Sequence, residues 1–196
     1  AAKAAELRSL RYQVNPHFLF NTLNSLSALV MTGKADRAEQ MIQTISRFYR
    51  HSLADHPTGD VSLEDEIDLQ EHYLAIEAVR FPERLRIKVD LPPELARYQV
   101  PGMILQPLVE NSVKYGVSAS RKPVTITIAA REEYGRLVLT VSDDGPGTAG
   151  EHGFGIGLAN VRDRLEARFG NSATIVSGPA LTGYETELRL PMVKHG

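Results

Sequence analysis

Cysteine is absent from this chain of 196 residues, which excludes both a disulfide framework and a cysteine metal site. No apolar run approaches the ~20 residues that a membrane-spanning helix needs, and nothing in the sequence resembles a signal peptide. The formal net charge is only −2 and no long basic run is present, which argues against nucleic acid or an anionic membrane surface as the main partner. The composition is that of an ordinary soluble globular protein, with room for one large domain or two small ones.

The N-terminal part of the chain reads as two amphipathic helices. Residues 3–31 predict one long helix, which Pro16 should kink because proline lacks an N–H and its ring crowds the preceding turn. Residues 36–54 predict a second helix with one apolar face. Two antiparallel helices bury too little surface alone, so we expect a homodimer with a four-helix bundle. The apolar positions are Leu7, Leu10, Val14, Phe18 and Ala28 on one stripe of the first helix, Tyr12, Leu19, Leu23, Leu26 and Val30 on its second stripe, and Ala38, Met41, Ile42, Ile45, Phe48, Tyr49 and Leu53 on the second helix.

The rest of the chain alternates helices and strands. Ser62 with Asp65 is typical of a capped helix start, and strands are expected where apolar and polar residues alternate between turn residues. In order, the pattern predicts a helix at 63–80, a strand at 84–91, a helix at 101–116, strands at 123–131 and 136–143, a glycine-rich stretch at 145–157, a helix at 157–169 and strands at 173–178 and 184–191. The predicted fold class is α+β: a helical module followed by an α/β sandwich with helices on one face of a mixed sheet.

Three stretches combine polar residues and glycines in patterns that indicate chemistry. LRYQVNPHFLFNTLNSL, residues 10–26, places His17 in an apolar, amide-rich segment, with Asn21 one helical turn further on. Downstream, the helical segment LQPLVENSVKYG is followed by DDGPG at 143–147 and GFGIGL at 153–158. Each glycine stretch alone is a weak signal, whereas their joint order is much stronger.

That joint order resembles the Bergerat-type ATP-binding fold of histidine kinases, gyrases and heat-shock chaperones of the ninety-kilodalton class. The segment around His17, LQPLVENSVKYG and YLAIEAVRF resemble the LytS/YehU-type sensor histidine kinases. The resemblance spans nearly the whole chain. It implies a dimerisation and histidine phosphotransfer hairpin at 1–60, a connecting helix at 61–82 and a catalytic ATP-binding domain at 83–196.

The resemblance implies a site for ATP and magnesium. Asn111 matches the magnesium-binding asparagine of the family, and Glu110 beside it would order metal-bound water or accept a proton. Lys114, one turn away, would approach the phosphates, and Tyr115 would line the same edge.

Asp143 matches the carboxylate that recognises the adenine amino group in this family. Glycines after it would let the backbone pass close to the ring, and glycines at the following helix start would leave N–H groups free for phosphates. Thr186 matches a threonine near the base, although Glu185 precedes it where the family often has glycine, and the lid at 148–152 is short. The predicted nucleotide-binding set is Asn111, Lys114, Tyr115, Asp143, Gly145, Gly147, Gly153, Gly155, Gly157, Leu158 and Thr186.

By the same resemblance His17 is the phosphoacceptor, whose neutral imidazole attacks the γ-phosphorus in line. Many histidine kinases place a carboxylate directly after this histidine as a base, but Phe18 stands there in this chain. Glu110 is therefore the candidate base, provided that the domains dock closely. Asn21 is the candidate for orienting the water that dephosphorylates a response regulator.

The implied function is ATP-dependent autophosphorylation on His17 and transfer to an aspartate of a response regulator, with a LytTR-type regulator as the family's usual partner. The expected location is cytoplasmic, with any sensor or membrane part before Ala1, because the chain starts abruptly in the helix-forming AAKAAELRSL. Two alternatives stay open. A serine kinase or anti-sigma factor would share the ATP fold without needing NPHFLFN, and a degenerate module would hold ATP without transfer.

Overall fold

The computed structural model describes residues 15–52, 59–146 and 155–194. Several sequence predictions lie outside these residues. They are the helix before Asn15 with Leu7, Leu10, Tyr12 and Val14, the inward position of Leu53, the glycines Gly147 and Gly153, and the lid at 148–152. None of the described helices is long and apolar enough to cross a membrane.

Helix α2 spans Pro16–Met31 and begins where the sequence placed a kink. Asn15 has an extended backbone, with φ −64° and ψ 116°, and its side-chain oxygen accepts a hydrogen bond from the N–H of His17 at 3.0 Å. Proline suits the first helical position, where its missing N–H leaves no bond unmade, and it disfavours helical geometry in the residue before it. Asn15 is thus the N-cap of α2 and is not itself helical, so the predicted continuous helix over 3–31 is wrong at this residue.

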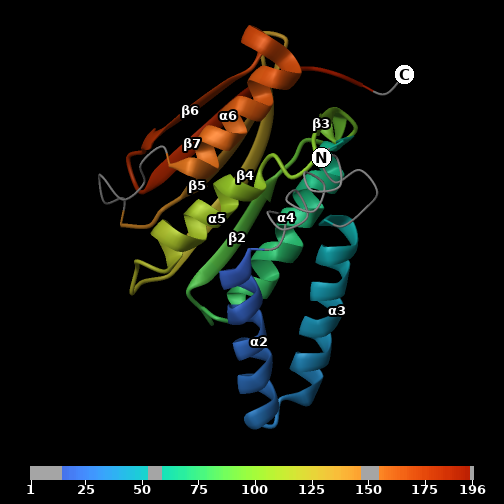
Figure 1. Ribbon diagram of the computed structural model, residues 1–196. Coiled ribbons are helices and arrows are strands. Elements are labelled where there is room, and N and C mark those ends of the chain that lie inside the picture. Colours follow the sequence, from blue (N-terminus) through green and yellow to red (C-terminus); the bar gives the residue numbers. More distant parts are fainter. Residues whose placement is uncertain (1–14, 53–58, 147–154, 195–196) are drawn as a thin grey trace.

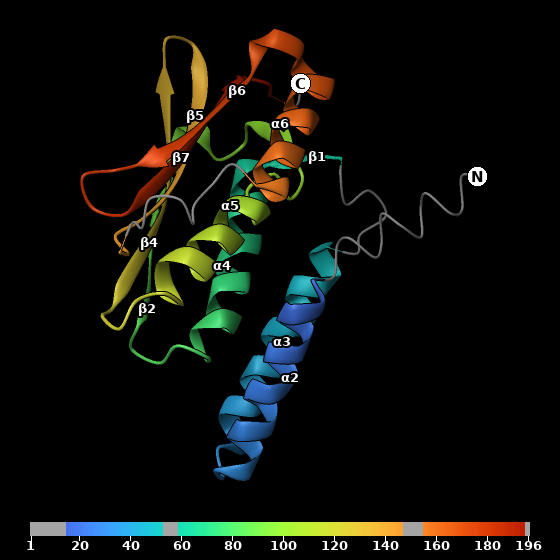
Figure 2. The ribbon, with the colours of Figure 1, turned by 60° about the vertical axis from the view of Figure 1, so that its left-hand side comes forward.

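Helix α3, Ala35–Ser52, returns antiparallel to α2, so the two form a hairpin that extends beyond the end of the sheet (Figures 1 and 2). Ala38, Met41 and Phe48 are buried as predicted, whereas Ile42 is 49% exposed, so its inward placement is wrong for the single chain.

A cluster of four aromatic rings joins this hairpin to helix α4, Leu63–Ala78. The ring of Phe18 lies 5.5 Å from that of Phe48, 6.4 Å from that of Tyr49 and 5.1 Å from that of Tyr73, centroid to centroid. Offset and edge-on ring pairs of this kind stabilise packing beyond their buried area. The residue after His17 therefore anchors the start of α2 to the α4 surface.

The sheet has five strands in the order β2-β4-β5-β7-β6, with β2 parallel to β4 and the other neighbours antiparallel. Helices α4, α5 and α6 cover one of its faces (Figure 2). Alternation along the strands turns apolar side chains toward these helices. The strands are β2 Leu85–Asp90, β4 Val124–Glu133, β5 Arg136–Asp143, β6 Thr174–Pro179 and β7 Tyr184–Pro191, and the later helices are α5 Gln106–Asn111 and α6 Ile156–Phe169.

A small second sheet was missed by the sequence analysis. Strand β1, Asp60–Ser62, pairs antiparallel with β3, Gln99–Pro101. The helix predicted over 101–116 therefore begins only at Gln106, because Pro101 belongs to a strand and Met103 has a positive φ of 61°. Buried Glu66 on α4 accepts the N–H groups of Met103 and Leu105, at 2.7 and 2.9 Å, and so holds this turn against α4.

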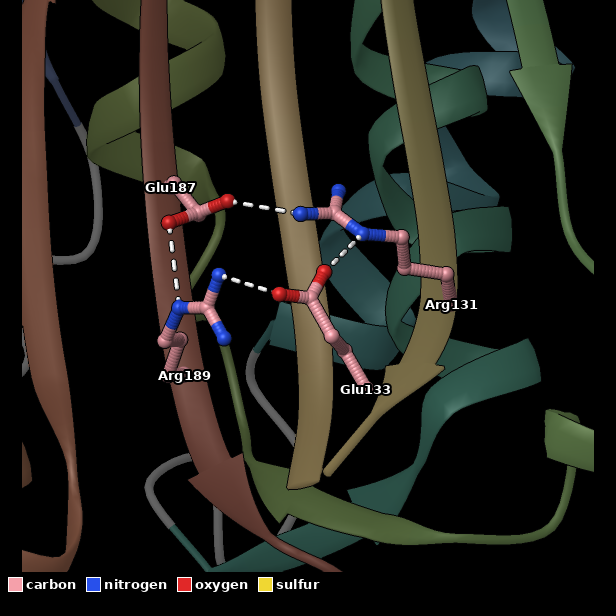
Figure 3. Close-up of polar contacts among 4 residues, drawn as sticks. All are labelled: Arg131, Glu133, Glu187 and Arg189. Carbon is pink, nitrogen blue, oxygen red and sulfur yellow. Dashed lines mark hydrogen bonds and ion pairs between the residues drawn. The ribbon is translucent and has the colours of Figure 1, made fainter. Parts of the chain in front are cut away.

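The face of the sheet opposite the helices carries a ring of four charged side chains (Figure 3). Arg131 contacts Glu133 and Glu187, both at 2.9 Å, and Arg189 contacts the same two carboxylates at 3.1 and 3.2 Å. Val138 lies between these residues in the strand register and is fully buried. The ion pairs thus cover an apolar residue on a face that has no helix over it.

Candidate functional site

The acidic–Asn segment lies on α5 and on the π-helix that continues it, Ser112–Val117. Asn111 is half-buried at the junction of the two. Glu110 accepts a hydrogen bond from the side-chain amide of Gln106 at 3.2 Å, and burial raises the pKa of Glu110 above its usual range. The ammonium of Lys114 is exposed, 5.0 Å from the ring centroid of Tyr115. π-Helical turns inside α-helices are frequent at functional sites.

Asp143 ends β5 with only 4% of its surface exposed, and its Oδ1 accepts the N–H of Gly145 at 3.1 Å. Gly116 lies against this carboxylate so closely that a Cβ there would be 2.8 Å from Cγ and Oδ1 of Asp143. A Cβ on Gly145 would in turn lie 2.8 Å from the Cα of Gly116. Gly116 and Gly145 thus bring backbone atoms close to this buried carboxylate.

Two glycines in contact with Asp143 were missed from the sequence. Gly116 is the last residue of the stretch LQPLVENSVKYG, and its place in that motif was the available signal. Gly183 precedes β7 at a φ of +83°, and a Cβ there would lie 1.8 Å from the carbonyl oxygen of Asp143. Only glycine fits such a position, because the backbone conformation and the contact both exclude a side chain.

Thr186 is buried on β7, where it pairs with Val141 of β5. Val141 and Asp143 are two residues apart on β5 and so face the same side of the sheet, which places Thr186 and Asp143 together on the helix-facing side. Its hydroxyl lies 2.9 Å from that of Ser177. Asp144 accepts the N–H of Thr125 at 2.7 Å and ties the end of β5 to β4.

Helix α6 begins at Gly155, which has no side chain to cap the first free N–H groups. Such a helix start attracts anions through those groups and the helix dipole. A Cβ on Gly157 would lie 3.5 Å from the Cβ of Pro107, an ordinary packing distance, so α6 lies next to α5 at this point. Leu158 is 1% exposed and anchors the helix in the core.

His17 lies on α2, away from these elements in the chain, and its side chain is exposed. Asn21 is half-buried and lines a groove of about 480 Å³ between α2 and the end of α4, together with Arg80. The described site residues thus form two groups: the helix carrying His17, and the elements that carry Asn111 and Asp143.

Two known protein families match successive parts of this chain. The Histidine kinase family matches residues 5–85, and the family of Histidine kinase-, DNA gyrase B-, and HSP90-like ATPases matches residues 99–194. The chain belongs to the histidine kinase family. This confirms the resemblance inferred from the sequence, and the ATPase match makes ATP the nucleotide of this histidine kinase domain.

The relatives of this histidine kinase core are sensor proteins. The Sensor histidine kinase BtsS of Escherichia coli (strain K12) is 38% identical over 189 residues, which cover 95% of this chain and 33% of that protein. The Sensor histidine kinase YesM of Bacillus subtilis (strain 168) is 36% identical over 174 residues, covering 86% and 30%. The chain spans about a third of the length of these curated relatives.

A solved structure confirms the predicted α+β fold class of the kinase core. The histidine kinase domain of the blue-light activated histidine kinase from Erythrobacter litoralis EL346 has a TM-score of 0.53 at 17% identity, covering 98% of this chain and 95% of that chain. At this identity the likeness concerns the fold alone.

The kinase core also contains an acidic cluster that sequence reasoning did not find. Glu77 on α4 is 3% exposed and accepts a hydrogen bond from Arg80 at 3.1 Å. Burial raises the pKa of Glu77, and the charge of Glu110 adds to the rise. Burial and both carboxylates raise the pKa of Tyr73 well above its usual range. Tyr73 is also the α4 residue whose ring contacts that of Phe18, the neighbour of His17.

Proposed function

We propose that this chain is the catalytic core of a two-component sensor kinase that phosphorylates itself on His17 from ATP and passes the phosphoryl group to an aspartate of a response regulator. The observation that carries the proposal is the buried Asp143 carboxylate with Gly116 and Gly145 packed against it. A buried carboxylate bordered by glycine backbone is the kind of group that would accept a hydrogen bond from the adenine amino group. The exposed imidazole of His17, on a helix docked to the same core, supplies the nucleophile.

The residues present fit magnesium and the phosphates. Asn111 is half-buried and offers a side-chain oxygen beside Glu110, whereas the described residues contain no group of three or more acidic or histidine side chains that would hold a metal without substrate. One protein oxygen plus phosphate oxygens is the usual magnesium arrangement, and the bound ion would offset the charge on those phosphates. Lys114, Tyr115 and the start of α6 at Gly155 complete the proposed phosphate side.

The proposed autophosphorylation uses these groups in the following way. A neutral imidazole nitrogen of His17 forms a bond to the γ-phosphorus while the bond from that phosphorus to the β,γ-bridging oxygen breaks, and ADP leaves. The imidazole proton needs an acceptor. Glu110 is the proposed base, because its raised pKa brings it closer to neutral pH. Asn21 is proposed to orient water for dephosphorylation of the regulator.

A homodimer is part of the proposal, and the hairpin carries the surface for it. Several large apolar side chains of α2 and α3 are exposed in the single chain: Leu19, Phe20, Leu23, Val30, Met31 and Ile42. Pairing two hairpins into a four-helix bundle would bury them. The same proposal divides the chain into a phosphotransfer hairpin at 1–60, a connecting helix at 61–82 and an ATP-binding domain at 83–196. It places this chain in the cytoplasm, with a sensor part outside this chain, and it makes a LytTR-type response regulator the partner.

Incubation with γ-labelled ATP and magnesium tests the function. We expect an acid-labile, base-stable label on the wild-type chain that His17→Ala abolishes. Ser27→Ala, exposed further along α2, is the matched control and should keep the label. Asn111→Ala should lose it through loss of the metal ligand. An acid-stable label would instead indicate a serine kinase, and nucleotide binding without any label would indicate a degenerate module.

A further inference from the structure

Arg84 connects the turn after α4 to the π-helix of the nucleotide site. Its Nη2 donates to the carbonyl oxygens of Val117 at 2.9 Å and Ser120 at 2.7 Å, which lie 33 and 36 residues further along the chain. The guanidinium also lies over the ring of buried Phe81, 5.2 Å from its centroid. Stacking on a ring and donating in a plane are properties of a guanidinium that a lysine ammonium does not reproduce.

The two carbonyls lie where the π-helix needs support. Helices end with carbonyl groups that have no partner inside the helix and carry partial negative charge. Val117 is the last residue of the π-helix and Ser120 follows it in the next turn. The carbonyl of Val117 also accepts the N–H of Ser120 at 3.1 Å, and the Arg84 guanidinium adds a cationic donor that bridges the two carbonyls. This bridge ties the end of the π-helix to the turn after α4.

Gly116 is the residue directly before the Val117 carbonyl that Arg84 holds. Gly116 is tightly packed: a Cβ on Gly145 would lie 2.8 Å from the Cα of Gly116, and a Cβ on Gly116 would lie 2.8 Å from Cγ of Asp143. Glycine at position 116 therefore lets the backbone of the π-helix lie against this carboxylate with no side chain between them. A shift of the end of the π-helix would move this backbone relative to the carboxylate, so the position of the proposed adenine acceptor depends on where this turn is held.

We propose that Arg84 is a positioning residue of the nucleotide pocket: it holds the end of the π-helix so that the backbone at Gly116 keeps the Asp143 carboxylate in place for adenine. This proposal rests on the proposed nucleotide binding. Arg84 acts through the backbone of Val117 and touches no part of the nucleotide in this role.

The test compares ADP and GDP affinity, measured by calorimetric titration of the full chain at 15 °C. Arg84→Ala removes two charge-assisted hydrogen bonds, and we expect ADP affinity to fall about tenfold, with the preference for ADP over GDP falling in parallel. Arg84→Lys should bind ADP with intermediate affinity. Arg86→Ala, exposed on β2 two residues away, is the matched control and should behave as wild type.

A purely structural role would lower the melting temperature without changing the affinity or the base preference of the folded protein. Unchanged ADP affinity and preference in folded Arg84→Ala would therefore overturn the proposal. If that variant does not fold, Arg84→Lys and Arg84→Gln decide instead: wild-type affinity and preference in both would overturn it, and weaker binding with a reduced preference would support it. A wild-type chain that binds no ADP would refute the proposed function itself, and the positioning role with it.

Discussion

Adding one methyl group at Gly116 is the most direct perturbation of the proposed adenine site. In Gly116→Ala the new Cβ would lie 2.8 Å from Cγ and from Oδ1 of Asp143, and 3.1 Å from Oδ2. Contacts below 3.0 Å are not tolerated, so the carboxylate has to rotate or the π-helix has to move. Either shift takes the adenine acceptor out of place, while the rest of the ATP site keeps its residues.

The magnitude follows from the bond that is lost. A hydrogen bond to a charged group contributes about 1.5–3 kcal/mol, so losing the adenine contact should weaken ADP binding roughly 10- to 100-fold. Folding should suffer little, because alanine is favoured over glycine in a helix interior by up to about 1 kcal/mol, which offsets part of the strain. Calorimetric titration with ADP measures the first effect and thermal denaturation the second.

Gly178→Ala is the matched control for this experiment. Gly178 lies on β6 with open space where the new methyl group would stand, since no atom lies within 4 Å of that position, and its φ is not positive. We expect it to bind ADP as wild type does. Wild-type affinity in Gly116→Ala would refute the reasoning, because it would mean that the carboxylate beside Gly116 is not the adenine acceptor.

Three further predictions concern stability and assembly. Burial raises the pKa of Glu66 from 4.5 to about 7, so between these pH values the folded chain holds a proton that the unfolded chain has released. The free energy of unfolding should therefore fall by about 3 kcal/mol between pH 4.5 and 8. In urea denaturation, the free energy of unfolding of Glu66→Gln should depend less on pH than that of wild type, and an unchanged pH dependence would contradict this. Phe18→Ala should cost about 3–5 kcal/mol of local stability, seen as faster hydrogen exchange in α2; wild-type exchange would argue against its anchoring role. Leu23→Glu should convert the proposed dimer to monomer in light scattering, and a persistent dimer would exclude this face.

The local sequence pattern was sufficient to predict most helices and strands of the α/β sandwich. Strands predicted at 123–131 and 136–143 appear as β4 and β5, because alternation is a property of each strand alone and the turn between them has positive φ at Tyr134 and Gly135. The helix predicted over 101–116 starts late for a non-local reason. Pro101 pairs with Asp60, and no pattern around Pro101 records that partner.

The sequence by itself determined which chemical groups this protein has for its proposed site: His17, Asn111, Asp143 and the glycines around them stand in motifs that can be read residue by residue. Only the tertiary structure decided what those groups touch. The hydrogen bonds of Arg84 to Val117 and Ser120, and of Glu66 to Met103 and Leu105, join residues 33–39 positions apart. A periodic pattern reports the element to which a residue belongs, whereas such contacts arise when separate elements pack together, and packing is a property of the whole chain.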